Sequence, residues 1–259
     1  MDSNLWSKTS LLTHMIKTKK TIAEMKALER GVTILADVLS ADDIIQIQEL
    51  YHRYSDKLTT IRRAENLGKK NNIINVPDNE FHLVDNIINS KLNLLPFLYE
   101  SINFYTIQNP YHLHSDTGKN NNIGYQQGVI PLSVLPANST AYTVIFNERV
   151  YFSSEYAPID KRVLKSPSYE PFYNIGTWDT TYYEGWADEY RISDDDCKLI
   201  WGTEWEHWKD CYKGFSINTI YKWKVGDILL FDRSLLHASS LLHVNGVDVK
   251  SGLLFLTYR

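Results

Sequence analysis

From residue 101 onward, the chain is dominated by short apolar runs that end at Asn, Pro or Gly. Runs of this kind are typical of β-strands. They occupy residues 102–107, 128–134, 141–146, 228–231 and 253–258. Helical spacing is instead found mainly before residue 101. Helices followed by many short strands favour one α+β or mainly β domain, with an antiparallel sandwich or barrel as its core.

The N-terminal hundred residues carry a clear helix start. Ser40 has the character of an N-cap, and Asp42 and Asp43 follow in the first turn, where the helix dipole favours acids. Apolar residues then recur every three or four positions through Tyr54, which predicts an amphipathic helix of about four turns. The other expectations here are helical spacing over 21–28, a strand over 31–37, a loop over 64–79 and a second helix over 80–100. We therefore expect residues 1–100 to form a helical support.

Residues 151–213 differ in composition from the rest of the chain. They hold 15 of the 33 aromatic residues and five of the seven tryptophans, with 13 acids against 7 bases. This is too aromatic for a disordered linker, so we interpret it as an ordered insertion between two strands. It is either a lid over a substrate or a surface subdomain or oligomer contact. The lid residues that we single out are Trp178, Tyr182, Tyr183 and Trp186.

Composition limits the possible functions. The net charge of −4 over 259 residues disfavours the broad basic surface of a duplex-binding protein, so no nucleic acid is expected. No apolar run reaches the roughly 18 residues that span a bilayer, so no membrane partner is expected either. Cys197 and Cys211 are too few for a disulfide scaffold, and residues 1–20 lack the apolar core of a signal peptide. We expect a soluble cytoplasmic protein with free thiols.

One histidine of the eight starts a His-x-Asp triplet, namely His114-Ser115-Asp116. On an extended strand, residues two apart point to the same side, so this triplet presents one imidazole and one carboxylate together. Two histidines and a carboxylate make the facial triad of non-haem Fe(II) sites. A third ligand could come from His237, which follows the Gly226-Asp227 turn and an apolar strand.

In this order, these segments resemble the iron(II)/2-oxoglutarate-dependent oxygenases, and most closely the phytanoyl-CoA hydroxylase-like group. The resemblance covers residues 101–150 and 214–259, together with the strand and helix at 31–54, and leaves the insertion out. It implies a double-stranded β-helix, which is a jelly-roll, cupin-like core. It also implies a hydroxylase that releases succinate and CO2.

The resemblance assigns roles to particular residues. His114, Asp116 and His237 would hold Fe(II), leaving two positions for 2-oxoglutarate and one for dioxygen. Members of the family that halogenate have a small residue in place of the aspartate, so Asp116 favours hydroxylation. Lys250, 13 residues after His237, stands where most members have an arginine for the distal carboxylate of 2-oxoglutarate.

The anchor for that carboxylate has a rival. Lysine is a point charge without the guanidinium fork, so it specifies the orientation of a carboxylate less well. Arg259 is the alternative, although on a regular strand it would face the opposite side from Lys250. Thr143, on a middle strand, could hydrogen-bond the 1-carboxylate.

Other readings of the residues stay open. His112 and His114 could form a cupin-type metal site that uses no 2-oxoglutarate. Glu204, Glu206 and His207 could be a ligand cluster or a solvated face, and the acid run 194–196 suits a helix start. His82 and His243 are taken as structural or surface residues. The chain could also be a non-enzymatic β-sandwich that binds a ligand through the insertion.

The substrate expected under a lid is a small or medium organic molecule. The acidity of residues 151–213 favours a neutral or cationic molecule over a polyphosphate, and their aromatic side chains could stack on a ring. A peptide or protein substrate is also compatible with the pattern. The sequence does not specify an oligomeric state.

Overall fold

The computed structural model describes residues 30–64, 69–92, 98–110, 113–116, 124–149, 185 and 187–258. Within them the fold is mainly β. The strands are β1 (Thr33–Leu35), β2 (Thr59–Ala64), β3 (Lys69–Asn75), β4 (Leu98–Ile107), β5 (Gly124–Leu135), β6 (Tyr142–Arg149), β7 (Ile217–Lys222), β8 (Ile228–Asp232), β9 (Leu235–Ser239) and β10 (Val249–Tyr258). The α-helices are α3 (Ala41–Tyr54), α4 (Asp78–Leu92), α5 (Asp194–Trp201) and α6 (Trp205–Cys211), with short 3-10 turns at Ser55–Lys57, Gly202–Glu204 and His243–Asn245.

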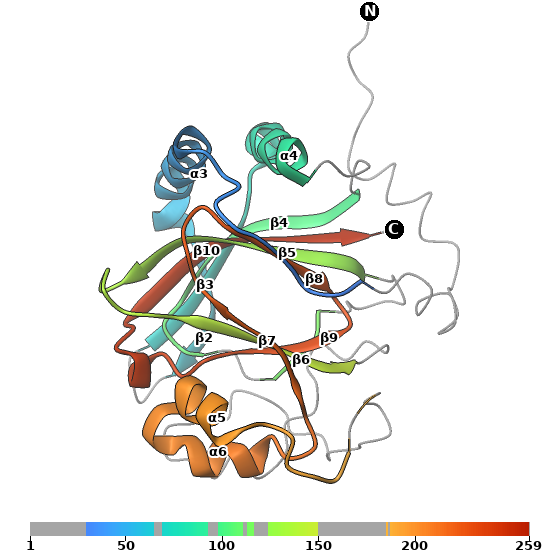
Figure 1. The fold of residues 1–259 in the computed structure, drawn as a ribbon. Helices are drawn as coiled ribbons and strands as arrows, with labels where there is room; N and C mark the ends of the chain where they lie inside the picture. The colour runs from blue at the N-terminus through green and yellow to red at the C-terminus, as the bar shows by residue number, and fades with distance from the viewer. Residues whose placement is uncertain are drawn as a thin grey trace, which may run out of the picture.

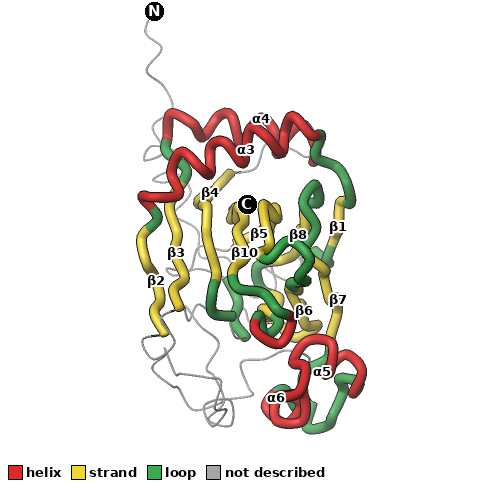
Figure 2. Tube along the Cα trace, turned by 90° about the vertical axis from the view of Figure 1, so that its left-hand side faces the viewer, coloured by secondary structure: helices red, strands yellow, loops and turns green. Residues whose placement is uncertain are grey.

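The strands form two antiparallel sheets that face each other (Figure 1). The large sheet has seven strands in the order β1-β8-β5-β10-β4-β3-β2, and the small sheet has three in the order β7-β6-β9. Figure 2 shows β2 and β3 at one edge of the large sheet, with α3 and α4 lying across its outer side. The molecule is therefore layered as helices, large sheet, small sheet and helices.

Helix α3 begins where the sequence predicts. The Ser40 hydroxyl accepts from the Asp43 backbone N–H at 3.2 Å, and the Asp43 carboxylate accepts from the Ser40 N–H at 2.8 Å. This reciprocal capping box satisfies two backbone donors that a helix start leaves unpaired. Helices α3 and α4 bury their apolar faces against the outer side of the large sheet. The main contributors are Ile47, Leu50, Val84 and Ile88 from the helices and Phe104, Ile130, Leu253 and Phe255 from the strands.

Side chains alternate in direction along the strands, and this divides the rest of the core in two. Between the sheets lie Val129, Leu229 and Phe231 of the large sheet and Ala141, Ile145 and Tyr221 from the small-sheet side. Below the small sheet, Phe146 packs with the aromatic residues of the α5–α6 segment, which are Trp201, Trp208, Tyr212 and Phe215. The C-terminal part of the aromatic-rich stretch is thus a packed helical layer.

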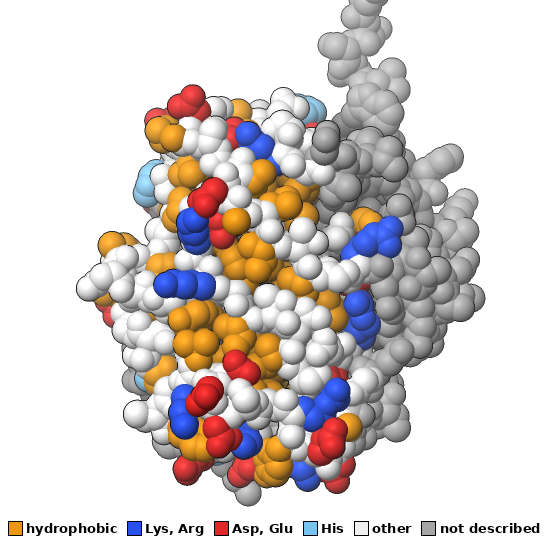
Figure 3. All heavy atoms as spheres, in the orientation of Figure 1, with side chains coloured by type: hydrophobic (Ala, Val, Ile, Leu, Met, Phe, Trp, Pro, Cys, Tyr) orange, Lys and Arg blue, Asp and Glu red, His pale blue; other side chains and the backbone are white. Residues whose placement is uncertain are grey.

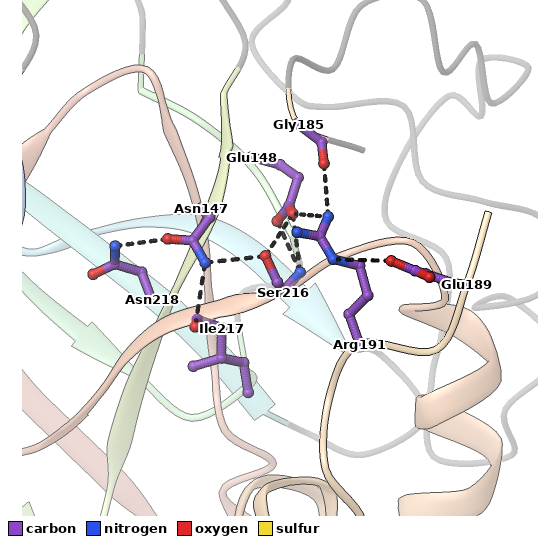
Figure 4. Close-up of polar contacts among 8 residues, drawn as sticks. All are labelled: Asn147, Glu148, Gly185, Glu189, Arg191, Ser216, Ile217 and Asn218. Carbon is purple, nitrogen blue, oxygen red and sulfur yellow. Dashed lines mark hydrogen bonds and ion pairs between the residues drawn. The ribbon is translucent and has the colours of Figure 1, made fainter. Parts of the chain in front are cut away.

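A buried carboxylate holds this layer to the small sheet (Figure 4). Glu148 of β6 is fully buried and accepts from the backbone N–H and the hydroxyl of Ser216 at 2.9–3.0 Å. Arg191 donates to the same carboxylate at 3.2 Å and to the Gly185 carbonyl at 2.7 Å. Burial raises the pKa of Glu148, against the hydrogen bonds from Ser216 and the charge of Arg191, which lower it.

Two predictions for the first hundred residues are wrong. The helix expected over 80–100 ends at Leu92, and β4 begins at Leu98, on either side of Pro96 in the sequence. The loop expected over 64–79 contains β3. This region therefore supplies three strands of the large sheet as well as helices, and is not a purely helical support. The helical spacing at 21–28 lies outside the described residues.

The asparagines of β3 explain why the sequence predicts a loop there, because asparagine is depleted in strands and favours turns. In β3 their amides find partners in neighbouring segments. Asn71 is fully buried, donates to the Asn109 carbonyl and accepts from the backbone N–H groups of Gln108 and Asn109, each at 3.0 Å. These bonds are between residues 37 or 38 positions apart, so local propensity could not reveal them.

The surface visible in Figure 3 mixes residue types, with apolar side chains in a broken band and charges of both signs around it. The exposed large apolar residues of the described chain include Ile34, Ile45, Leu135 and Val225. Among the described helices, none combines the length and the apolar character needed to cross a bilayer.

Candidate metal centre

Two histidines that are distant in sequence meet across an isolated antiparallel bridge. His114 donates its backbone N–H to the His237 carbonyl at 3.0 Å, and His237 returns a bond to the His114 carbonyl at 2.9 Å. Directly opposed residues project their side chains to the same face. The two imidazole rings accordingly lie with centroids 4.1 Å apart. His237 lies in the middle of β9, a separate strand after the apolar strand β8.

Asp116 completes the cluster from two residues beyond His114. Its backbone N–H donates to the Arg233 carbonyl at 3.2 Å, and its Oδ2 lies 3.3 Å from His237 Nε2. One ligand atom from each of His114, Asp116 and His237 falls within 4.8 Å of the others. The Asp116 side chain is 27% exposed and that of His237 is 9% exposed, so the cluster opens to the surface on its aspartate side.

The tautomer of His237 suits a metal ligand. Its Nδ1 lies 3.2 Å from the Leu235 carbonyl, which can only accept, so Nδ1 carries the proton. In the neutral ring, Nε2 is then the unprotonated nitrogen that a metal ion can bind, whereas in the protonated ring Nε2 donates to Asp116 Oδ2, 3.3 Å away. Metal-binding histidines commonly have their other ring nitrogen held in this way.

Electrostatics keep Asp116 ionised. Burial by itself would raise its pKa, but the hydrogen bond and charge of His237, with the charges of His114 and Arg233, hold the pKa well below its usual range. An ionised carboxylate is the form that binds a metal ion.

Arg233 is a site residue that the sequence analysis missed. Its side chain is 1% exposed, and its Nε donates to the Asp116 carbonyl at 2.6 Å. Nη1 donates to the Thr257 carbonyl at 3.1 Å and pairs with Glu100 at 2.5 Å. The guanidinium thus ties the ligand-bearing segment to β10 and β4. The only available signal was an arginine between two polar residues, Asp232 and Ser234, at the β8–β9 turn.

Lys250 lies at the start of β10, which runs between β4 and β5, and it is 1% exposed. Its Nζ sits 4.2 Å from the centre of the Trp223 ring, and burial lowers its pKa to about 7. No acid of the described residues pairs with it. Two residues on, Gly252 leaves room for Tyr105, because a Cβ there would come within 2.8 Å of the phenol oxygen.

Thr143 contacts the aromatic partner of Lys250 and shares a sheet face with His237. Trp223 donates its indole N–H to the Thr143 hydroxyl at 2.8 Å, so the hydroxyl keeps its own proton for another acceptor. Along β6, Thr143 is two residues from Ile145, which pairs with His237. Residues two apart share a face, so Thr143 and the His237 ring lie on the same inner face of the small sheet.

Several predicted site residues are not placed by the structure. Arg259, His112 and the four proposed lid residues Trp178, Tyr182, Tyr183 and Trp186 lie outside the described residues. On which side of β10 Arg259 lies relative to Lys250 therefore stays a prediction.

The alternative ligand cluster on the helices does not converge. Glu204 accepts from the Trp208 indole at 3.2 Å and contacts His243 Nε2 at 3.1 Å, whereas His207 faces the Cys211 thiol at 3.4 Å. Within the described chain, His114, Asp116 and His237 form the one group of three potential metal ligands. The acid run 194–196 starts α5, capped by Ser193, as expected.

Comparisons with known proteins give matches among solved structures only. No family model and no curated protein matches the sequence. Similar solved structures include the alpha-ketoglutarate-dependent carbocyclase SnoK from nogalamycin biosynthesis (TM-score 0.49, 12% identity, 93% of this chain and 84% of that chain). Two others are the epimerase SnoN with Fe3+, alpha ketoglutarate and nogalamycin RO (0.46, 10%, 96% and 84%) and EctD from S. alaskensis with 2-oxoglutarate and 5-hydroxyectoine (0.45, 12%, 93% and 77%). Because identities are low and TM-scores are below 0.5, the chemistry must be judged from the site.

Proposed function

We propose that this chain is an Fe(II)- and 2-oxoglutarate-dependent oxygenase that hydroxylates a small or medium organic substrate and releases succinate and CO2. One observation carries the proposal. A His-Asp-His cluster with ligand atoms within 4.8 Å of one another shares the inner face of the small sheet with Thr143, whose partner Trp223 contacts the buried cation of Lys250. 2-Oxoglutarate needs both of these features, because one end of it would chelate the metal ion and its distal carboxylate would pair with a cation.

The cluster fits Fe(II). Two imidazoles and one ionised carboxylate that leave other coordination positions open are the ligand set of non-haem Fe(II) oxygenases. His114, Asp116 and His237 would hold the ion. When bound with 2-oxoglutarate and dioxygen, iron supplies the oxidation in which one oxygen atom goes to the substrate and the other to succinate, with loss of CO2.

The buried Lys250 suits the distal carboxylate of 2-oxoglutarate. A buried ammonium without an acidic partner is costly, and a carboxylate brought by a ligand would neutralise it. Lys250 would bind the distal carboxylate, and the Thr143 hydroxyl would donate to the carboxylate nearer the metal. Arg259 is the alternative to Lys250.

We further infer a double-stranded β-helix of the phytanoyl-CoA hydroxylase type. Support comes from the path of the chain from β4 through the His114 bridge to β10. It crosses from one sheet to the other at every step except between β6 and β7, which are neighbours in the small sheet. In this view residues 101–150 and 214–259 form the core, and 151–213 form an insertion that acts as a lid through Trp178, Tyr182, Tyr183 and Trp186. Two buried free cysteines, Cys197 and Cys211, suit a reducing compartment such as the cytoplasm.

A cupin-type enzyme that uses no 2-oxoglutarate is the second candidate. It would leave Lys250 as a buried cation with no carboxylate of 2-oxoglutarate to bind. The two candidates therefore differ in whether the activity depends on Lys250.

The test is formation of succinate from 2-oxoglutarate by Fe(II)-loaded protein in air, without added substrate. We expect slow succinate production that is lost in Asp116→Ala and His237→Ala. In Lys250→Gln, the KM for 2-oxoglutarate should rise at least tenfold. His243→Ala, which changes an exposed histidine on the far side of the small sheet, is the control. Wild-type protein that binds iron but forms no succinate would contradict the proposal.

A further inference from the structure

Gln127 points a buried amide at the candidate metal centre. It lies near the start of β5, paired with Phe231 of β8 and Leu256 of β10, and it is 1% exposed. Gln127 shares a strand face with Val129, which lies between the sheets. Its side chain therefore enters the same interior as the three candidate metal ligands.

The two ends of this amide are in different situations. Gln127 Nε2 lies 3.2 Å from His237 Nε2, which is the unprotonated nitrogen when the ring is neutral, so the amide can donate to that lone pair. Gln127 Oε1 is buried and has no hydrogen-bond partner. Buried polar atoms are nearly always paired in native proteins, and an unpaired one calls for an explanation.

A bound metal would leave the Gln127 amide with fewer hydrogen-bond partners. The ion would take the His237 Nε2 lone pair, and the Gln127 amide would lose its acceptor. The loaded site would then hold an amide beside the metal with both its donor end and its acceptor end unpaired. A ligand in the open part of the site must supply the partners.

2-Oxoglutarate can satisfy only half of the need. Its carboxylates and ketone accept hydrogen bonds but donate none at neutral pH, so they suit Nε2 and leave Oε1 unpaired. Oε1 requires a donor. This argument rests on the proposed function.

We propose that Gln127 is a substrate-binding residue, and that the substrate carries a hydroxyl or N–H group that donates to Gln127 Oε1 close to the oxidised carbon. The substrate class is then a polar molecule such as an alcohol, amine or amide, rather than a bare hydrocarbon or acyl chain. Sites built to bind a donor discriminate strongly against analogues that lack it.

The test uses matched probes on protein loaded with Mn(II), which takes the same nitrogen and oxygen ligands, and 2-oxoglutarate. One pair is N-methylacetamide and N,N-dimethylacetamide, and the other is tert-butanol and tert-butyl methyl ether. Paramagnetic relaxation of the probe methyl protons reports how much of each probe lies near the metal. In at least one pair, the donor probe should bind about three- to tenfold better, which is the effect of one hydrogen bond.

Variants separate this role from a structural one. Gln127→Met should remove the preference while leaving the Mn(II) affinity unchanged or tighter, because the amide no longer competes for His237 Nε2. Gln127→Glu keeps an acceptor and should keep the preference. Gln126→Met is the control, because Gln126 faces the other side of the sheet.

The outcomes distinguish two failures. Wild-type protein that binds Mn(II) and 2-oxoglutarate but shows equal relaxation within both probe pairs would overturn the role of Gln127 alone. A preference that survives in folded Gln127→Met would do the same. Failure of wild-type protein to bind Mn(II) through Asp116 would overturn the proposed function together with this inference.

Discussion

At the scale of single residues, the buried cations distinguish this site from a generic metal cluster. Lys250 faces an aromatic ring, and Arg233 holds the backbone of a candidate ligand. In the sequence, only resemblance to a family points to Lys250, and no pattern points to Arg233. The roles of both residues depend on their burial by strands that are distant in sequence, and a local sequence pattern does not reveal such burial.

The first prediction concerns Lys250 and pH. Burial lowers its pKa to about 7 from an ordinary value of 10.5, so between these values the unfolded chain binds more protons than the folded one. The destabilisation due to Lys250 is therefore complete below pH 7 and fades as the pH rises towards 10.5. Relative to Lys250→Met, the unfolding free energy of the ligand-free wild type should rise with pH by up to about 1.4 kcal/mol per unit in this window.

Urea unfolding of both proteins from pH 6 to pH 10 measures this difference. A constant difference across the window would contradict the burial of an unpaired ammonium at this position. Lys224→Met, which removes an exposed lysine, is the control.

The second prediction concerns Arg233. Lysine cannot donate from two rigidly spaced nitrogens to the Asp116 and Thr257 carbonyls while it also pairs with Glu100. We expect Arg233→Lys to weaken Mn(II) affinity by about 10- to 100-fold, as is usual when a group that orients a metal ligand is lost. Competition titration measures the affinity, with Arg53→Lys as the control because Arg53 is an exposed partner of Glu80. Unchanged affinity in a folded variant would show that Arg233 does not position Asp116.

At the scale of elements, the predictable parts are those whose signals are local. The Ser40 cap, the first helix and the apolar strands β8 and β10 follow from capping chemistry and periodicity. Strand β3 does not, because its asparagines are satisfied by residues far along the chain. Strand β9 was missed because its five residues are apolar or small with one histidine, and periodicity says little over so short a run.

The third prediction concerns the attachment of the α5–α6 segment. Replacing the buried Glu148 with Gln removes an acceptor from the Ser216 N–H and hydroxyl and from Arg191. The free energy of unfolding should fall by about 1–3 kcal/mol, the range for leaving a buried donor unpaired. Hydrogen exchange should speed up over residues 187–216, while Mn(II) affinity stays the same.

Glu189→Gln is the matched control, because Glu189 is 68% exposed and lies 3.8 Å from the same arginine. Equal stability of the two variants would mean that the Glu148 contacts do not hold this layer in place.

At the scale of the whole molecule, the architecture explains how ligands far apart in sequence meet. Asp116 and His237 are separated by 120 intervening positions, yet a β-bridge between the two sheet-forming halves sets the histidines side by side. The sequence predicted this triad and the mainly β class, because ligand types and strand patterns are local. It could not predict which strand neighbours which, and so it gave neither Gln127 nor Arg233 a role.

The central claim is that one site binds Fe(II) and 2-oxoglutarate together. The most direct test is an anaerobic titration of Fe(II) into the protein with and without 2-oxoglutarate, followed by the weak visible charge-transfer absorption of the chelate. We expect a band that needs both additions, is absent in Asp116→Ala and requires much more 2-oxoglutarate in Lys250→Ala. Iron that binds without any band would contradict the 2-oxoglutarate site, and no iron binding would contradict the metal centre itself.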